Sequence, residues 1–66
     1  MIEFNAWLTL TQKSGMKVLL RHSHILAVHE MGDGVEIVYQ DGDTNIRYEM
    51  DIKFDDFHKL LYTKIM

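Results

Sequence analysis

Four histidines are the residues of this chain best able to bind a metal or to transfer a proton: His22, His24, His29 and His58. On a strand, His22 and His24 would share a face, and this spacing suits two imidazole ligands of a zinc ion. The third ligand would be His29, Glu30 or a carboxylate of the C-terminal region. However, the 22–24 segment reads as an exposed polar connector, and no tetrahedral ligand set is visible. We therefore predict no metal site and no cofactor.

Other residues with chemical capacity do not form a catalytic pattern. Residues 41–45 resemble the start of a calcium loop, but Ile46 stands where such a loop needs glycine, and no bidentate Glu follows. Asp55 and Asp56 are adjacent on a predicted helix, so their side chains diverge. The chain has no cysteine, both serines lie in short turns, and no phosphate loop or dinucleotide motif is present. We predict no catalytic residues and no enzymatic activity.

Length and composition define one small domain that spans residues 1–66, with 47% hydrophobic residues and a net charge of −3. A chain of this length buries only about 60% of its unfolded surface, and its core rarely contributes more than roughly 3–5 kcal/mol net. Because cysteine is absent, disulfides cannot supplement the core. A partner subunit is one remaining source of stability.

The same numbers restrict the cellular setting. The net charge argues against a general polyanion binder. The N-terminal residues lack the basic start and apolar run of a signal peptide, and no stretch is long enough to cross a membrane. We expect a cytoplasmic protein without a membrane partner.

A β-hairpin over residues 34–50 is the element on which the rest of the sequence is organised. The Asp41-Gly42 pair predicts a type I′ turn. That turn pairs Gln40 with Asp43. It also places Tyr39 opposite Thr44, Ile37 opposite Ile46 and Val35 opposite Tyr48 on one face, with Val38 opposite Asn45 and Glu36 opposite Arg47 on the other. Pairs of these kinds contribute roughly 0.2–1 kcal/mol each.

Three further strands are expected before the hairpin, and a helix after it. Residues 2–11 alternate between apolar and polar, with Leu8 and Leu10 on one side and Trp7 among polar neighbours on the other. Shorter strands follow at 16–21 and 25–31. From about Ile52 the period becomes helical, and one apolar stripe carries Phe54, Phe57, Leu60, Leu61 and Ile65. The predicted fold is α+β: a five-stranded antiparallel meander, or a small curled barrel, with one C-terminal helix.

Several strands are apolar on both faces, as in the consecutive residues Val18, Leu19 and Leu20. One short helix can cover only one face of the sheet. We therefore expect Leu19, Leu26, Val38 and Trp7 to lie on a second apolar face, buried in a homo-oligomer, with a dimer the expected form, or by barrel closure. Trp7 would otherwise be an amphipathic surface residue, or would turn inward at a bulge.

The sequence also resembles a known family. The matching features are Leu8-Thr9-Leu10, Gly15, Val18-Leu19-Leu20, the spacing of Ile25 and Val28, the strand 35–39, the Asp41-Gly42 turn and the helix from Phe54. With these features the sequence resembles the flagellar and swarming motility protein family. Its members are short bacterial chains with phage-borne relatives. The resemblance implies a non-enzymatic accessory protein and carries over no site residue.

Three functions follow as hypotheses. The first is a small protein-interaction module that self-associates and binds a larger, unidentified protein, for example as a phage-encoded inhibitor of a host or defence protein. The second is a small-molecule-binding homo-oligomer that uses Arg21, His22, His24 and Arg47. The third is a small barrel that binds single-stranded nucleic acid with Trp7, Lys17, Arg21 and Arg47. Glu3, Glu36 and Glu49 are expected at the same outward positions and argue against this last function.

Overall fold

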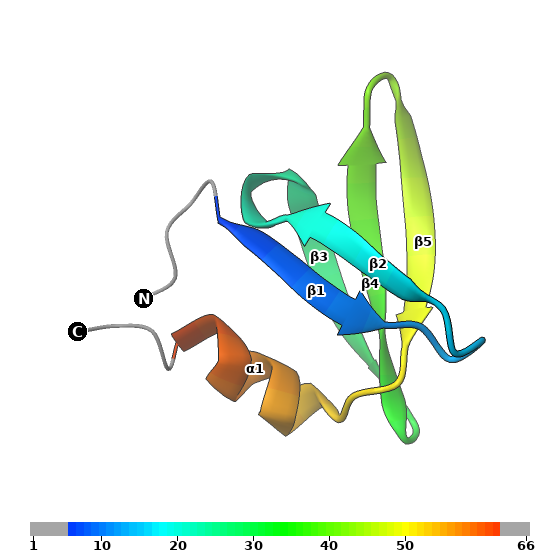
Figure 1. Cartoon of the computed structure of the whole chain (residues 1–66), viewed down its shortest axis with the longest axis vertical. Helices are drawn as coiled ribbons and strands as arrows, with labels where there is room; N and C mark the ends of the chain where they lie inside the picture. Colours follow the sequence, from blue (N-terminus) through cyan, green and yellow to red (C-terminus); the bar gives the residue numbers. More distant parts are fainter. Residues whose placement is uncertain (1–5, 63–66) are drawn as a thin grey trace.

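The computed structural model describes residues 6–62, which form two antiparallel sheets and one helix (Figure 1). Sheet A consists of β1 (Trp7–Thr11) and β2 (Lys17–Arg21), and sheet B of β3 (Ile25–Met31), β4 (Gly34–Asp41) and β5 (Thr44–Met50). A 3₁₀ helix, η1 (His22–His24), joins the sheets, and α1 (Phe54–Tyr62) follows β5. The α+β class and the C-terminal helix are confirmed. The single five-stranded meander is wrong, and the strands do not close into a barrel.

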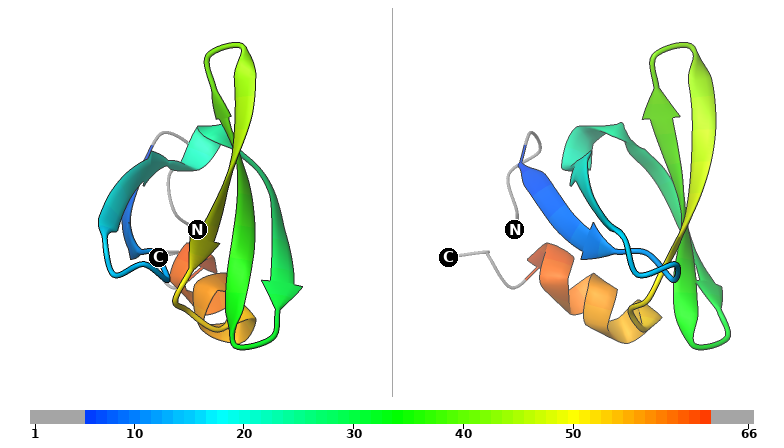
Figure 2. Two further views of the ribbon diagram at one scale, coloured as in Figure 1. Left: turned by 90° about the vertical axis from the view of Figure 1, so that its right-hand side faces the viewer. Right: turned by 45° about the vertical axis from the view of Figure 1, so that its right-hand side comes forward.

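The two sheets separate at η1, because the chain changes direction there between two extended residues. Arg21 and Ile25, which flank η1, both have β-region dihedral angles. As a result, β3 begins in a different layer from β2 and does not pair with it. At the other end of the molecule the sheets meet again through a single bridge between Gln12 and Met50. Figure 2 shows the sheets facing each other, with α1 at the open end between them.

The core lies between the two sheets and is sealed by the helix. Its buried members are Leu8, Leu10 and Leu20 from sheet A, Val35, Ile37, Tyr39 and Met50 from sheet B, and Phe57 from α1. Each sheet therefore covers the apolar inner face of the other within one chain. This arrangement differs from the predicted one, in which a single sheet has only a helix to cover it.

The β4–β5 hairpin has a different register from the predicted one. Its two-residue loop is Gly42-Asp43, so Asp41 pairs with Thr44, Tyr39 with Ile46, Ile37 with Tyr48 and Val35 with Met50. Gly42 has a φ of 64° at the first loop position, and no described residue other than glycine has a positive φ. Positive φ at that position alone is the feature of a type II′ turn rather than type I′. The Thr44 hydroxyl donates a 3.0 Å hydrogen bond to the Asp41 carbonyl oxygen, which fixes the turn.

The register error leaves the predicted faces intact, because the ladder is shifted by two residues and side chains alternate with a period of two. Glu36 therefore stays on the face that carries Arg47, but it lies opposite Glu49. Arg47, opposite Val38, reaches Glu36 diagonally, with its Nη1 3.0 Å from Oε1.

The alternation of β1 and the apolar stripe of α1 are confirmed within the described residues. Leu8 and Leu10 are buried, whereas Trp7, Thr9 and Thr11 are exposed. The helix begins at Phe54, and the Lys53 carbonyl oxygen accepts the first hydrogen bond, from the Phe57 N–H at 2.9 Å. Ile65 and residues 2–5 lie outside the described residues. Within residues 6–62, no helix combines the length and the apolar character that a membrane span requires.

Candidate functional site

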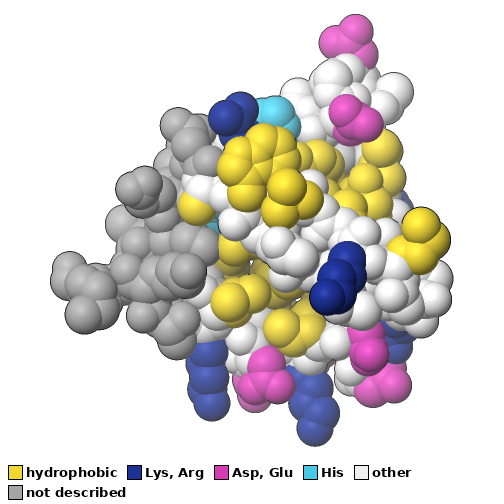
Figure 3. Space-filling model, in the orientation of Figure 1, with side chains coloured by type: hydrophobic (Ala, Val, Ile, Leu, Met, Phe, Trp, Pro, Cys, Tyr) yellow, Lys and Arg dark blue, Asp and Glu magenta, His cyan; other side chains and the backbone are white. Residues whose placement is uncertain are grey.

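The outer face of sheet A carries two large apolar side chains that the described part of the chain covers only partly. Trp7 is 54% exposed and Leu19 is 55% exposed. In the β1–β2 register Trp7 lies opposite Arg21 and Thr9 lies opposite Leu19, so the two apolar residues are diagonal neighbours. Trp7 is thus a surface residue, and the inward bulge is wrong. We call Trp7, Thr9, Lys17, Leu19 and Arg21 the Trp7 surface, and Figure 3 shows apolar side chains gathered over β1 and β2 on this side.

Arg21 contacts two neighbours at this surface, one through its side chain and one through its backbone. Its guanidinium carbon lies 5.3 Å from the centroid of the Trp7 ring, which is a cation–π arrangement. Its backbone N–H donates a 2.9 Å hydrogen bond to the hydroxyl of Tyr39 on β4. Its side-chain Nε is buried and has no hydrogen-bond partner within residues 6–62. The arginine therefore stands beside an exposed aromatic ring with one donor unsatisfied.

Charges are divided unevenly between the outer faces of the two sheets. Lys17 and Arg21 are the charged residues of the outer face of sheet A, and the strand pattern places no carboxylate beside them. Glu36 and Glu49 lie instead on the outer face of sheet B, near Arg47. The objection that these glutamates would neutralise a basic face with Trp7 is therefore wrong. Glu3, the third glutamate of that objection, lies outside the described residues.

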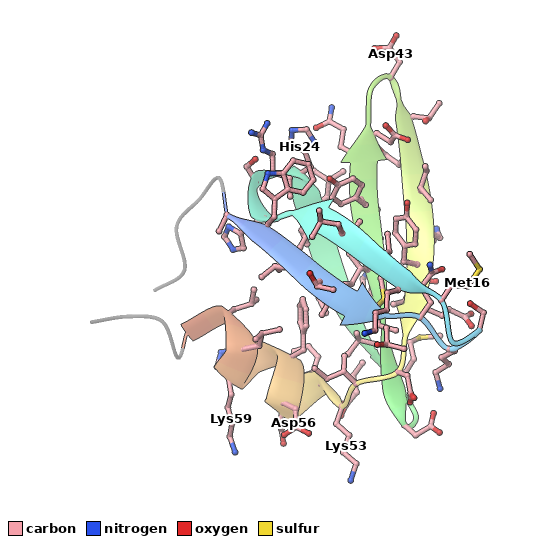
Figure 4. All side chains as sticks on the ribbon, in the orientation of Figure 1. Met16, His24, Asp43, Lys53, Asp56 and Lys59 are labelled. Carbon is pink, nitrogen blue, oxygen red and sulfur yellow. The ribbon has the colours of Figure 1, made fainter. Side chains whose placement is uncertain are left out.

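Three aromatic rings form a row from η1 along sheet B. The ring of His24, in η1, lies 5.8 Å from that of Tyr39. The Tyr39 ring meets the Tyr48 ring edge-on at 6.0 Å and 74°. Figure 4 shows His24 beside the η1 end of β2. The sequence assigns Tyr39 only to a face of the hairpin, because alternation gives a side chain its face but not the partner of its hydroxyl.

The four predicted interface residues do not form one surface. Trp7 and Leu19 lie together on sheet A, whereas Leu26 and Val38 belong to sheet B. Leu26 stands at a register shift between Ile25 and Ala27 and is 53% exposed, and Val38 is half-buried. The strands place these two pairs on different layers of the molecule.

The predicted ligand-binding residues are likewise only partly brought together. Arg21 lies next to His22 and His24 of η1, both half-buried. Arg47 is on the outer face of sheet B and pairs with Glu36. Among residues 6–62, no group of three or more His, Asp or Glu side chains is arranged to hold a metal ion.

A hollow of about 470 Å³ lies at the end of the molecule away from η1, and none of the predicted ligand-binding residues lines it. It is lined by Lys13, Glu30, Met31, Gly32, Val35 and Glu49. The Lys13 ammonium forms an ion pair with Asp33 in the β3–β4 turn. Its bond to Asp33 raises the pKa of Lys13, and the same bond lowers the pKa of Asp33. The Lys13 ammonium at this hollow is thus already paired with a carboxylate of the same chain.

Comparisons with known proteins provide no information on the function of this chain. A scan against protein-family models found no match, and searches of curated proteins and of solved structures found none either. The resemblance to the flagellar and swarming motility family is not tested by these comparisons and stays a prediction.

Proposed function

We propose that this protein is a non-enzymatic interaction module that binds a larger protein through the Trp7 surface. The observation that carries the proposal is the adjacent placement of two half-exposed apolar side chains, Trp7 and Leu19, beside Arg21. Trp and Arg are enriched among the residues that dominate binding energy at protein interfaces. Because the Arg21 guanidinium already packs against the Trp7 ring, less side-chain freedom is lost when a partner binds.

Self-association is a separate part of the proposal and involves sheet B rather than the Trp7 surface. Each inner face is covered within one chain, so a second copy is not needed to complete the core. The exposed Leu26 and the half-buried Val38 on sheet B are the apolar residues that a second copy would cover. Light scattering at micromolar concentration tests this part, and a monomer there would remove it without affecting the Trp7 surface.

A phage-encoded inhibitor that acts by occupying a host or defence protein in the cytoplasm is one form of this function, and it depends only on the family resemblance. Affinity purification from a host lysate, with mass spectrometry of co-eluting proteins, tests the general proposal. We expect one large partner at fixed stoichiometry with the wild-type chain. That partner should be lost with the double variant Trp7→Ala/Leu19→Ser.

The matched control is Met16→Ser, which removes another exposed apolar side chain, 69% exposed, from the β1–β2 turn. This variant should retain the partner. Recovery of the same partner with the double variant would show that the Trp7 surface is not the binding site.

A second candidate, binding of single-stranded nucleic acid, is favoured by one observation: Lys17 and Arg21 lie on the same outer face as Trp7, and Glu36 and Glu49 do not. Aromatic stacking beside cations is the usual arrangement for this function. Two cations contacting two phosphates would give a slope of about −1.4 in the logarithm of the affinity against that of salt concentration. Titration of a labelled oligothymidylate at several salt concentrations tests it, and an affinity independent of salt would eliminate it.

The small-molecule alternative has less support, because Arg47 is separated from the other three predicted ligand-binding residues. The hollow on the far side of the molecule is lined by different residues.

A further inference from the structure

The free edge of β2 offers backbone hydrogen-bonding groups beside the Trp7 surface. In sheet A, β2 has one neighbour, β1, among the described residues. The His22 N–H donates to the Ala6 carbonyl oxygen and the Gln12 N–H to the Met16 carbonyl oxygen, both at 2.8 Å. These bonds identify the hydrogen-bonded pairs of the ladder, which alternate with pairs that are not hydrogen-bonded.

The alternation fixes which residues of β2 point away from β1. Even-numbered positions of β2 bond to β1, so the N–H and C=O groups of Lys17 and Leu19 point toward the free edge, as does the N–H of Arg21. The bond from the Arg21 N–H to the Tyr39 hydroxyl, at 2.9 Å, agrees with this direction. The stretch from Lys17 to Leu19 is therefore an unpaired strand edge.

Each of the other outer edges is contacted by another part of the chain, whereas within residues 6–62 no such contact reaches the 17–19 stretch of β2. The Glu49 carbonyl oxygen on β5 accepts from the Lys13 N–H, and the Thr11 carbonyl oxygen on β1 accepts from the Asp51 N–H, both at 2.9 Å. The β3 strand is contacted by α1. An unpaired edge is a template for another strand.

We infer that the partner contributes an extended acidic and apolar segment that pairs antiparallel with the free edge of β2; this inference rests on the proposed function. The side chains of β2 that face outward beside the edge are Lys17, Leu19 and Arg21. Partner residues directly opposite them lie on the same outer face, so an acidic, an apolar and an acidic residue complement them in that order. Main-chain bonds would supply affinity, and these alternate side chains specificity.

Charge also excludes a second copy of this chain from the same edge. Two β2 strands paired antiparallel about Leu19 would place Lys17 of each copy opposite Arg21 of the other. Like charges directly opposite each other destabilise a strand pair. The two cations therefore oppose self-pairing and favour an acidic strand from another protein.

The probe is a synthetic peptide, acetyl-Thr-Glu-Val-Leu-Val-Glu-Thr-amide, titrated into the full chain while the fluorescence of Trp7, the only tryptophan, is recorded. In the inferred register the central leucine lies opposite Leu19, and its N–H bonds to β2, whereas the N–H groups of the two valines point away. Methylation of the leucine nitrogen should weaken binding at least about tenfold, since it removes a hydrogen bond and blocks the edge. Methylation of a valine nitrogen should change the affinity of the peptide less than about threefold.

Charge is tested separately. A peptide with lysine in place of both glutamates should bind at least about tenfold more weakly to the wild-type chain. The Lys17→Glu variant should lose affinity for the acidic peptide, whereas Lys53→Glu, a charge reversal next to α1, should not. Circular dichroism would confirm that both variants are folded.

The results separate the strand pairing from the proposed function. Equal loss with both methylated peptides, or loss with neither, would overturn the strand pairing. Suppose that the peptide does not bind while the double variant Trp7→Ala/Leu19→Ser still loses the lysate partner. That combination would overturn the strand pairing and leave the proposed function standing. Binding of oligothymidylate in preference to the peptide would overturn the strand pairing in favour of the nucleic-acid candidate.

Discussion

Removal of the Tyr39 hydroxyl tests how the two sheets are held together near η1. Tyr39 is 9% exposed, and its hydroxyl accepts the Arg21 N–H at 2.9 Å, so one side chain of sheet B bonds to the backbone of sheet A. Tyr39→Phe leaves this partly buried N–H without a partner. A lost hydrogen bond of this kind costs about 1–2 kcal/mol. That is a large share of the roughly 3–5 kcal/mol expected for a chain of this size.

Urea unfolding followed by circular dichroism measures the effect. For a slope of about 1 kcal/mol per molar urea, the midpoint should fall by about 1–2 M with the slope unchanged. The melting temperature should fall by about 5–15 °C. The control is Tyr48→Phe, which removes the same atom from the neighbouring half-buried tyrosine and should change stability by less than about 0.5 kcal/mol. A Tyr39→Phe midpoint equal to that of the wild type would refute the bond as a link between the sheets.

Three further changes test other parts of the fold. Gly34→Ala should destabilise by about 1–3 kcal/mol in urea unfolding, because a Cβ there would collide with the Met50 carbonyl oxygen. Phe57→Ala should leave the chain largely unfolded by circular dichroism, because this 1%-exposed side chain is the helix's buried core residue and its truncation costs about 3–5 kcal/mol. Asp33→Asn should lower stability at neutral pH, because the bond to Lys13 lowers the pKa of Asp33 below its ordinary 3.8. The difference should disappear as the pH falls through that lowered pKa, where the wild-type carboxylate also loses its charge.

Each of these changes has a control elsewhere in the chain. Gly32→Asn should be tolerated, since Asn adopts a φ of +52° readily and a Cβ at that position meets no atom within 4 Å. Phe54→Ala removes a half-buried ring of the same helix and should cost less than Phe57→Ala. Asp43→Asn at the hairpin tip removes a carboxylate for which residues 6–62 provide no ion pair, so at neutral pH it should change stability less than Asp33→Asn. If a test variant and its control changed stability equally, the physical reason given for that test variant would be contradicted.

Local patterns in the sequence were sufficient to predict the faces of the strands and the class of fold. The alternation around Leu8 and Leu10 placed Trp7 on the opposite face from these leucines, and the 3.6-residue period placed Phe57 on the apolar stripe of the helix. These assignments hold because burial depends on period, which is a local property. The helix start is close to the predicted one for the same reason.

The hairpin register could not be obtained in this way, because residues 41–43 provide a glycine flanked by two aspartates. Either Asp41-Gly42 or Gly42-Asp43 makes a two-residue loop. The second choice pairs Val35 with Met50, two fully buried residues, and adds the pair Asp41–Thr44 to the ladder. The choice is thus made by core packing far from the turn.

The arrangement of the sheets was missed for a similar reason. Nothing in the composition of residues 22–24 shows that η1 redirects the chain into a second layer. The sequence led to one sheet with two apolar faces, and hence to a second subunit. The bond from Arg21 to Tyr39 and the bridge between Gln12 and Met50 join residues distant in sequence, so no local pattern contains them.

The order of the strands has a consequence for the kinetics of folding. Every full ladder joins strands that follow one another in the chain, so most contacts close short loops. The chain contains no proline, which removes the commonest source of slow isomerisation. We expect stopped-flow refolding in one rapid exponential step, with the Gln12–Met50 bridge, which encloses most of the chain, among the last contacts to form.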